Sequence, residues 1–454
     1  MQAREIDVDT VVDGQKFGRF NLGLLVWSFL AMFTDGFEIS SLGLAAPHII
    51  REWHVPAAAL GPTLSASLVG ILVGAPLFGH LGDRYGRRFA IILGCLVFGV
   101  TTLAVVATST TTQIMALRFL TGVGMGGLMP NTVALNSELS PRRLRARLII
   151  LMFMGITLGS AAPGFVAAFF VPTHGWKSLF VLGGLVPLAV GVALIFALPE
   201  SVKYLALRGD RRSQLIATLR RMRPDLSIPD DAEFAVARSD RPAEKAGLRP
   251  IFSGGLLPIT LLLWLCFATA LMANYFLNSW MPLLFEAKGI DPADAALVAT
   301  MYHIGATVGG LAMSFVLDRF GFLAIAAMLA LAAPAIMTIG LPGVPTPLLA
   351  VFVGLSGFCV LGAQFGANAA SGLIYPTAYR AKGAGLAFAV GRFGSVLGPL
   401  VGAAMLAMKL ALPAMLVVVA APMLVGAVAA LTLAQISRRR FGGLRISEGE
   451  EAAA

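Results

Sequence analysis

The stretch GHLGDRYGRR, Gly79–Arg88, gathers four charged residues between two long apolar runs. A shorter version, LDRFG, stands at 317–321, and its aspartate follows that of the first stretch by 235 positions. SPRRLRA at 140–146 is answered by YPTAYRA at 375–381 with the same offset. A constant offset in two separate loops predicts two homologous halves with their elements in the same order.

Composition indicates what the two halves are made of. Of the 454 residues, 57% are hydrophobic and only 13% are charged, which is too little charge for a water-exposed surface. A helix needs about 20 apolar residues to cross a bilayer. Twelve runs meet this length, at 20–47, 58–81, 89–108, 111–137, 148–171, 176–198, 257–285, 293–316, 321–341, 346–374, 383–408 and 411–435. The predicted fold class is an all-α polytopic membrane protein, with twelve transmembrane helices in two pseudo-symmetric six-helix bundles.

The basic residues predict the orientation of these helices. Of the 34 Lys and Arg residues, 28 fall on the side of the N-terminus and four on the opposite side, while Arg118 and Arg392 lie within spans. Basic loops favour the cytoplasmic side, so we expect both termini in the cytoplasm and the chain in a bacterial inner membrane. The net charge of +10 has this topological cause, because no basic stripe is interleaved with aromatic residues as nucleic-acid binding would require.

The runs and the gaps between them predict five segments. These are a cytoplasmic N-terminal segment (1–19), a first bundle (20–198), a cytoplasmic loop (199–256), a second bundle (257–435) and a cytoplasmic tail (436–454). Within the loop, 202–222 alternates apolar and basic positions at helical spacing, which favours a helix on the inner membrane surface as much as a solvated linker. The cysteines, Cys95, Cys266 and Cys359, lie in apolar runs without metal-ligand spacing and are expected to be packing residues.

Two acids and two arginines lie inside predicted spans, where an ionisable group is costly unless it is paired or solvated. Asp35 and Glu38 share a helix face, and Arg118 can reach the same depth. An acid pair facing a fixed cation suits proton coupling, although a structural ion pair remains an alternative. Arg392 has no acid within a turn of its own helix, so we expect its planar guanidinium to bind a substrate carboxylate, with a structural arginine as the alternative.

Polar residues near the predicted midplane complete the candidate site. His303 is expected to hold a proton or to donate to substrate, with a structural histidine as the alternative. Amide and phenol side chains recur at helical spacing on two spans and are candidates for the cavity lining: Asn274, Tyr275, Asn278, Gln364 and Asn368. Glycines in the fourth, fifth and eleventh spans are expected to serve close helix packing. The GVGMGG stretch has no preceding strand, so it does not indicate a nucleotide site.

The chain resembles the major facilitator superfamily over essentially its whole length, on GHLGDRYGRR, on RFLTGVGMGG at 118–127 and on the six-plus-six repeat. DGFE at 35–38, LPESVKYL at 198–205 and NYFLNSWMPLLF at 274–285 are similar to the aromatic acid:proton symporter family, the hydroxybenzoate-type transporters. The usual pattern in the first helix is Asp-Gly-x-Asp, whereas Glu38 stands in the second acidic place here. Sugar porters share part of this pattern but have paired glutamines in the seventh helix that are missing here.

The resemblance implies a proton-coupled symporter that imports a small organic acid by alternating access, with an aromatic carboxylate such as a hydroxybenzoate favoured. Alternatives are an aliphatic organic-acid or dicarboxylate symporter, a sugar porter and a drug:proton antiporter. It also supports a conformational latch of charged residues at the inner helix ends: Asp83, Arg84, Arg87, Arg88, Glu138, Asp318 and Arg319. The five histidines form no HExxH or other clustered pattern, so an enzyme is not expected. We expect no cofactor, no metal and no nucleic acid. The expected energy source is a proton gradient, and the expected partners are the bilayer, protons and a small organic anion. We expect the protein to function as a monomer.

Overall fold

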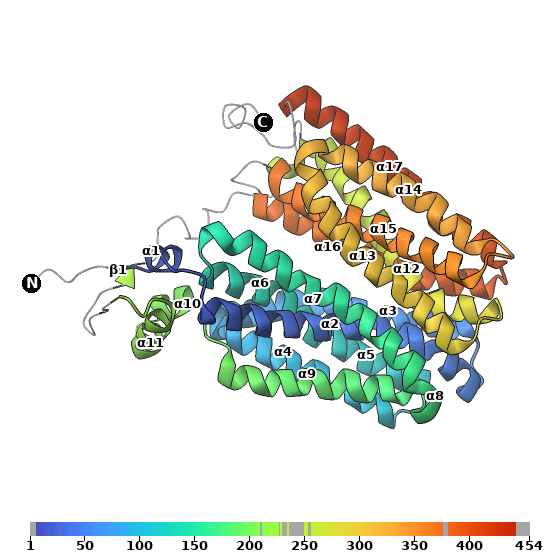
Figure 1. Cartoon of the computed structure of the whole chain (residues 1–454), viewed down its shortest axis with the longest axis horizontal. Coiled ribbons are helices and arrows are strands. Elements are labelled where there is room, and N and C mark those ends of the chain that lie inside the picture. Colours follow the sequence, from blue (N-terminus) through green and yellow to red (C-terminus); the bar gives the residue numbers. More distant parts are fainter. Residues whose placement is uncertain are drawn as a thin grey trace, which may run out of the picture.

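The protein is a bundle of long helices (Figure 1). The structure, a computed structural model, describes residues 6–208, 211–226, 228, 234–235, 249–252, 256–375 and 380–441. The long helices of the first half are α2 (Arg19–Trp53), α3 (Leu60–Tyr85), α4 (Arg87–Ala104), α5 (Thr111–Gly126), α6 (Leu128–Leu139), α7 (Arg142–Phe169) and α9 (Lys177–Ala197). Those of the second half are α12 (Leu256–Ala287), α13 (Pro292–Phe320), α14 (Phe322–Gly340), α15 (Thr346–Ile374), α16 (Arg380–Ala407) and α17 (Leu412–Phe441).

Eleven helices within the described residues are long and apolar enough to cross a membrane. The remaining predicted span, 111–137, corresponds to the consecutive helices α5 and α6. Gly127 separates them with φ −82° and ψ −24°. These angles are right-handed helical, so the backbone stays helical from α5 into α6. The chain is therefore a multi-pass integral membrane protein whose twelve spans are these eleven helices and the α5–α6 pair.

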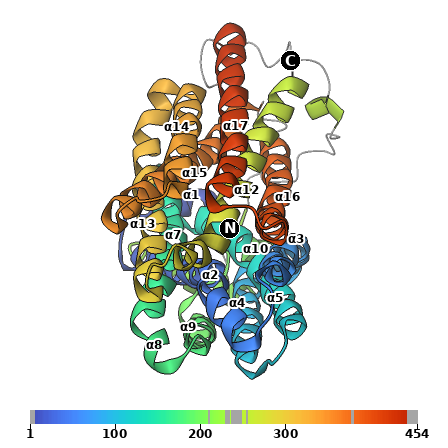
Figure 2. The same cartoon turned by 90° about the vertical axis from the view of Figure 1, so that its right-hand side faces the viewer.

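The helices form two bundles, which Figure 2 shows one above the other. In the first bundle α2 packs on α7, α3 on α5, and α4 on α9; in the second, α12 packs on α16, α13 on α15, and α14 on α17. We call the end at which α2 begins and α17 ends the termini end, and the opposite end the far end. The predicted fold of two six-helix bundles is confirmed, while the residue boundaries of the five predicted segments remain a prediction.

The repeat predicted from two loops extends into the helix packing. A methyl group on Gly122 would lie 2.0 Å from the carbonyl oxygen of Ser67, and one on Gly357 would lie 1.9 Å from that of Tyr302. Both members of the second contact follow those of the first by 235 positions. The same offset relates the contacts of three further glycine pairs, Gly70 and Gly305, Gly74 and Gly309, and Gly159 and Gly394. The absence of a side chain at equivalent positions lets equivalent helices approach closely in both halves.

The halves contact each other toward the far end. There α2 packs on α12, α3 on α16 and α7 on α13. Gly43 on α2 lies against the backbone of Asn278 on α12, where a methyl group would come within 2.6 Å of the carbonyl oxygen. Arg51 on α2 forms an ion pair with Glu286 on α12, again 235 positions apart. The seam between the halves is therefore closed at the far end of α2 and α12.

The short elements at the termini end pack on one another. They are β1 (Ile6–Asp7), α1 (Val8–Asp13), α10 (Val202–Leu207), α11 (Arg212–Met222) and β2 (Phe234–Ala235). The apolar side of α11, with Leu215 and Leu219, is buried in the same cluster as Val8 of α1, and β1 pairs in parallel with β2. Of the two alternatives for 202–222, neither a single membrane-surface helix nor a solvated linker describes these residues: they form α10 and α11, and the apolar side of α11 packs on protein.

Other expectations can be compared with the described residues. The three cysteines are free and buried, as predicted for packing residues. Gly86 and Gly321, at equivalent places in the two charged loops, have φ of 108° and 56°, a conformation that glycine adopts without steric cost. The YPTAYRA loop at 375–381 falls mostly on residues outside the described ranges, as do the start of the N-terminal segment and most of the C-terminal tail.

Candidate functional site

Glu38 and Arg118 form a buried ion pair inside the first bundle. Glu38 extends from α2 and Arg118 from α5, and their side chains are 0% and 3% exposed. Arg118 also donates from Nη2 to the hydroxyl of Ser67 on α3, at 3.2 Å. Burying both charges is tolerated because each compensates the other. The Oε2 atom of Glu38 is buried without a hydrogen-bond partner among the described residues, so this carboxylate retains a free acceptor.

Asp35 faces a different cation. It lies one turn before Glu38 on α2 and is also buried, and Arg392 on α16 lies within electrostatic range of its carboxylate. The sequence had suggested one cluster of two acids around Arg118, and an Arg392 with no acid within a turn of its own helix. In the structure Glu38 pairs with Arg118, while Asp35 lies within electrostatic range of Arg392.

Arg392 has aromatic and apolar neighbours on both sides of the seam between the halves. Its guanidinium lies 5.0 Å from the ring centroid of Phe388 and within reach of the Tyr275 hydroxyl. From the first half, the sulfur of Met129 lies 3.9 Å from Nη2. A guanidinium in such surroundings can bind a carboxylate while the flat groups around it contact an aromatic ring.

A second polar cluster lies farther toward the far end. His303 on α13 has its Nε2 atom 3.2 Å from the hydroxyl oxygen of Ser40 on α2 and 3.5 Å from Nδ2 of Asn278 on α12. Asn278 also donates to Ser40 at 3.4 Å. We call Ser40, Asn278 and His303 the seam triad. It joins the two halves through uncharged hydrogen-bonding groups.

The remaining predicted lining residues lie within the second bundle. Asn274 accepts a hydrogen bond from Tyr302 at 2.9 Å. Gln364 and Asn368 contact each other along α15 at 3.4 Å, and the Oε1 atom of Gln364 is buried without a partner among the described residues. The described contacts do not connect these amides to Arg392, so their role in substrate binding remains a prediction.

The described contacts of the predicted latch lie within single halves. Arg87 forms an ion pair with Asp83 and lies 3.8 Å from Glu138. The main-chain carbonyl of Arg84 accepts from the Tyr204 hydroxyl. In the second half, Arg319 stacks on Phe320 at 5.3 Å; the role of its neighbour Asp318 stays a prediction.

Glu200 ties the first charged loop to the end of α9. Its carboxylate accepts from the backbone N–H groups of Arg88 and Ser201 at 3.2 and 2.9 Å, while the Arg88 side chain donates to the carbonyl of Ile195. Burial raises the pKa of Glu200 above its usual range, and the backbone hydrogen bonds act in the opposite direction. A latch between the halves, which would require another conformation, remains a prediction.

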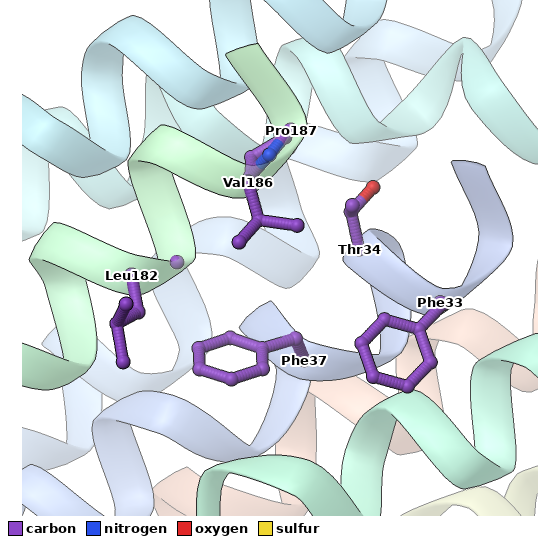
Figure 3. Close-up of a pocket in the computed structure, with 7 residues that line it drawn as sticks. Phe33, Thr34, Phe37, Leu182, Val186 and Pro187 are labelled. Carbon is purple, nitrogen blue, oxygen red and sulfur yellow. The ribbon is translucent and has the colours of Figure 1, made fainter. Parts of the chain in front are cut away.

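The first bundle also contains an apolar cavity of about 110 Å³ between α2 and α9. Figure 3 shows the rings of Phe33 and Phe37 beside it, with Leu182, Val186 and Pro187 on the opposite side. Thr34 is the polar residue in its lining, and its hydroxyl already donates to the carbonyl of Ala31. This cavity lacks a cation for a carboxylate and does not match the predicted substrate site.

Four residues of the site were not predicted from the sequence: Ser40, Ser67, Met129 and Phe388. Serine, methionine and phenylalanine in an apolar run carry no charge that would mark them, although Ser40 follows the acidic DGFE stretch by two positions. The glycines of the fourth, fifth and eleventh spans do contact neighbouring helices, as expected. Within the part of the chain that the structure describes, no group of three or more His, Cys, Asp or Glu side chains could hold a metal ion.

Comparison with known sequences identifies transporters. The family model described as Major Facilitator Superfamily matches residues 28–296 and 263–451. The 4-hydroxybenzoate transporter PcaK of Pseudomonas aeruginosa is 36% identical over 88% of this chain and 90% of its own length. A gallate transporter of Pseudomonas putida is 34% identical over 94% of both chains. The 3-(3-hydroxy-phenyl)propionate transporter of Escherichia coli is 32% identical over 84% of this chain and 86% of its own.

Solved structures support the fold. The inward open conformation of the xylose transporter XylE from E. coli superposes with a TM-score of 0.68 at 14% identity, covering 91% of this chain and 96% of the other. A bacterial homologue of the human lysosomal transporter Spinster, in an inward-facing and unoccupied conformation, superposes with a TM-score of 0.67 at 17% identity, covering 95% and 100%. At these identities the likeness concerns the fold alone.

Proposed function

Since the chain belongs to the Major Facilitator Superfamily and is a membrane transporter rather than an enzyme, we propose that it imports an aromatic carboxylate together with protons. The relatives named above carry 4-hydroxybenzoate, gallate and a hydroxyphenylpropionate according to their descriptions. These compounds share a carboxylate and a hydroxylated ring. A hydroxybenzoate is therefore the substrate class that we propose for this chain.

The observation that carries the proposal is that Asp35 on α2 lies within electrostatic range of Arg392 on α16, across the seam. A substrate carboxylate and the Asp35 carboxylate are alternative partners for the same guanidinium. Protonation of Asp35 removes its charge and leaves Arg392 free for the substrate. Proton and substrate then bind with a favourable coupling free energy, which is by necessity reciprocal.

The Glu38–Arg118 pair would have a separate part in the cycle. Both groups belong to the first bundle, so the pair does not need to break when the halves move against each other. The unpartnered oxygen of Glu38 gives a proton a place to bind on α2, about 4.5 Å along the axis from Asp35 at 1.5 Å per residue. We assign Glu38 a role in passing the proton to or from Asp35.

We further propose that the described conformation is open toward the termini end, with that end in the cytoplasm. The seam contacts of Gly43 and of Arg51 with Glu286 lie at the far end, and the charged loop residues contact their own halves at the termini end. Alternating access would separate the far-end contacts and close the termini end. The transporter would work as a monomer in the inner membrane, driven by the proton gradient and without a cofactor.

The test is uptake of labelled 4-hydroxybenzoate into proteoliposomes with the pH gradient imposed in either direction. We expect accumulation when the interior is alkaline, and its loss when a protonophore is added. Accumulation that requires an acidic interior would indicate an antiporter. Uptake of aliphatic acids or sugars without uptake of the aromatic acid would contradict the substrate class.

Arg392→Ala tests the site itself. We expect it to abolish both uptake and the melting shift that 4-hydroxybenzoate produces, because a ligand stabilises only a protein that binds it. Arg392→Lys should rescue poorly, since an ammonium group lacks the planar fork. Arg438→Ala, at an exposed position near the end of α17, is the matched control. Undiminished binding in Arg392→Ala would remove this residue from the site.

A further inference from the structure

The seam triad offers a hydrogen-bonding site without a net charge. Ser40, Asn278 and His303 are at most 8% exposed, and their mutual distances of 3.2 to 3.5 Å are at or beyond the long end of the usual range. The small cavity beside them is lined by described residues that include no Asp, Glu, Lys or Arg. Such a site favours a neutral group that both donates and accepts a hydrogen bond, and a phenolic hydroxyl does both.

Along α2 and α12, the rise from the residues near Arg392 to the triad is comparable to the length of one substituted ring. On α12, Asn278 lies three residues beyond Tyr275, which faces Arg392; on α2, Ser40 lies five residues beyond Asp35, which also faces Arg392. These separations amount to rises of about 4.5 and 7.5 Å at 1.5 Å per residue. The carboxylate and the para substituent of a benzoate are separated by a length between these two values.

The triad also has to exchange partners during transport. Ser40 belongs to the first half, whereas Asn278 and His303 belong to the second, so opening of the far end separates the hydroxyl of Ser40 from both. All three buried polar groups would then lose a partner across the seam, which is unfavourable unless another group replaces it. A ring hydroxyl that enters with the substrate can hydrogen-bond to Ser40 on one side and to Asn278 and His303 on the other, because it both donates and accepts.

We infer that the seam triad binds the ring hydroxyl opposite the carboxylate and thereby makes the transporter selective for 4-hydroxybenzoate over benzoate. This inference rests on the proposed function, because it assumes that Arg392 holds the carboxylate of an aromatic acid. Beyond that function, the inference names the group that determines specificity: a hydrogen-bonding cluster rather than a shape-selective apolar pocket. Sites of this kind reject an analogue without the hydroxyl because their polar groups remain unpaired.

The first test varies the ligand and leaves the protein unchanged. Dissociation constants of purified protein are measured for benzoate, 4-hydroxybenzoate, 3-hydroxybenzoate and 4-methylbenzoate. We expect 4-hydroxybenzoate to bind at least tenfold more tightly than benzoate, and 4-methylbenzoate to gain nothing from its methyl group. Equal affinity for benzoate and 4-hydroxybenzoate would overturn the inference while leaving the proposed function intact. A preference for 3-hydroxybenzoate would overturn the para assignment.

The second test varies the triad. Ser40→Ala and His303→Leu should each lower the affinity for 4-hydroxybenzoate severalfold and leave that for benzoate unchanged, whereas His303→Gln, which keeps a hydrogen-bonding group, should retain part of the preference. Ser356→Ala is the matched control, since that buried hydroxyl donates to the carbonyl of Val353 on its own helix. Equal losses for both ligands would show that the triad only maintains the seam.

The two proposals fail in different ways. If the wild-type protein binds neither aromatic acid, the proposed function fails and this inference with it. If Arg392→Ala loses both ligands while the triad variants do not change the ratio of their affinities, the proposed function stands and the triad is not the specificity site.

Discussion

Asp35 and Glu38 stand one helical turn apart on α2 and face different arginines. Because the two acids lie near different arginines, the role of each can be tested by a separate substitution. In the proposed mechanism Asp35 competes with the substrate for Arg392, while Glu38 is paired with Arg118 within one half. A change at Asp35 should therefore act on the coupling of proton and substrate, and a change at Glu38 on proton movement.

We predict that Asp35→Asn and Glu38→Gln each abolish accumulation driven by a pH gradient, and that Glu38→Gln keeps counterflow, the exchange of labelled for unlabelled substrate. Exchange requires the loaded carrier to reorient but not to release its proton. The measurement compares gradient-driven uptake with counterflow in the same proteoliposomes. Both variants accumulating substrate like the wild type would show that these acids are not the coupling groups.

The Glu38–Arg118 pair gives a prediction for stability. Arg118→Ala leaves a buried carboxylate without its counter-charge, which costs about 3–5 kcal/mol when one partner of a buried pair is removed. Combining it with Glu38→Gln should cost less than the sum of the two single changes. The check is the melting temperature in detergent of both single variants and the double variant.

Arg118→Ala combined with Asp35→Asn serves as the control, because the described contacts pair Arg118 with Glu38 and not with Asp35. Here we expect nearly additive losses. Additivity in the first combination and coupling in the second would mean that Arg118 interacts with Asp35 rather than with Glu38.

At the scale of the elements, glycines decide how closely helices cross. A methyl group on Gly122 would meet the backbone of Ser67 at 2.0 Å, and one on Gly357 would meet that of Tyr302 at 1.9 Å. Neither contact involves the end of a flexible side chain, so the helices themselves would have to separate. A Gly→Ala change should therefore lower stability in the same way at equivalent helix crossings of the two halves.

We predict that Gly122→Ala and Gly357→Ala each destabilise the protein by about 1–3 kcal/mol, the usual cost of forcing extra volume into a packed interior. Gly79→Ala is the matched control on α3, since a methyl group there meets nothing within 4 Å, and alanine favours a helix over glycine. Thermal melting of the three variants in the same detergent is the measurement. A loss in Gly79→Ala equal to that in Gly122→Ala would show that the close crossing is not the cause.

At the scale of the whole molecule, the seam is closed where α2 and α12 meet. Arg51 and Glu286 pair there, and the 235 positions between them make them equivalent residues of the two halves. An ion pair at an exposed position contributes up to about 1 kcal/mol, and such a difference changes the ratio of two conformations about fivefold at 1.4 kcal/mol per factor of ten. The pair can therefore influence the conformational equilibrium without controlling it alone.

We predict that Arg51→Glu and Glu286→Arg each shift the transporter toward an opening at the far end, and that the double exchange restores the wild-type balance. The readout is the labelling rate of a cysteine introduced as Ser65→Cys on α3, where the serine hydroxyl donates to the carbonyl of Val396 across the seam. Labelling should rise severalfold in the single variants. A double variant that labels as fast as the single ones would show that the pair does not hold the seam.

The sequence by itself determined the fold and the identity of the charged site residues. Apolar length and the offset of 235 positions predict twelve spans in two bundles, because a bilayer imposes one length on every span and a repeat imposes one order. Buried charges such as Asp35 and Arg392 were recognisable because an ionisable group in hydrocarbon is energetically costly and therefore marks a functional candidate. Their equivalents in the other half are Ala270 and Thr157, so the charged site does not follow the repeat that organises the packing.

Only the tertiary structure decided which groups meet. Helical spacing placed Asp35 and Glu38 on one face but could not assign them to different arginines, since α5 and α16 belong to different halves and their approach to α2 depends on bundle packing. The same holds for the seam triad: Asn278 and His303 were recognisable as polar candidates, but their contact with Ser40 joins three helices from both halves. The apolar face of α11 could have lain on a membrane or on protein, and its contact with α1 was decided by long-range packing, which periodicity along one segment does not encode.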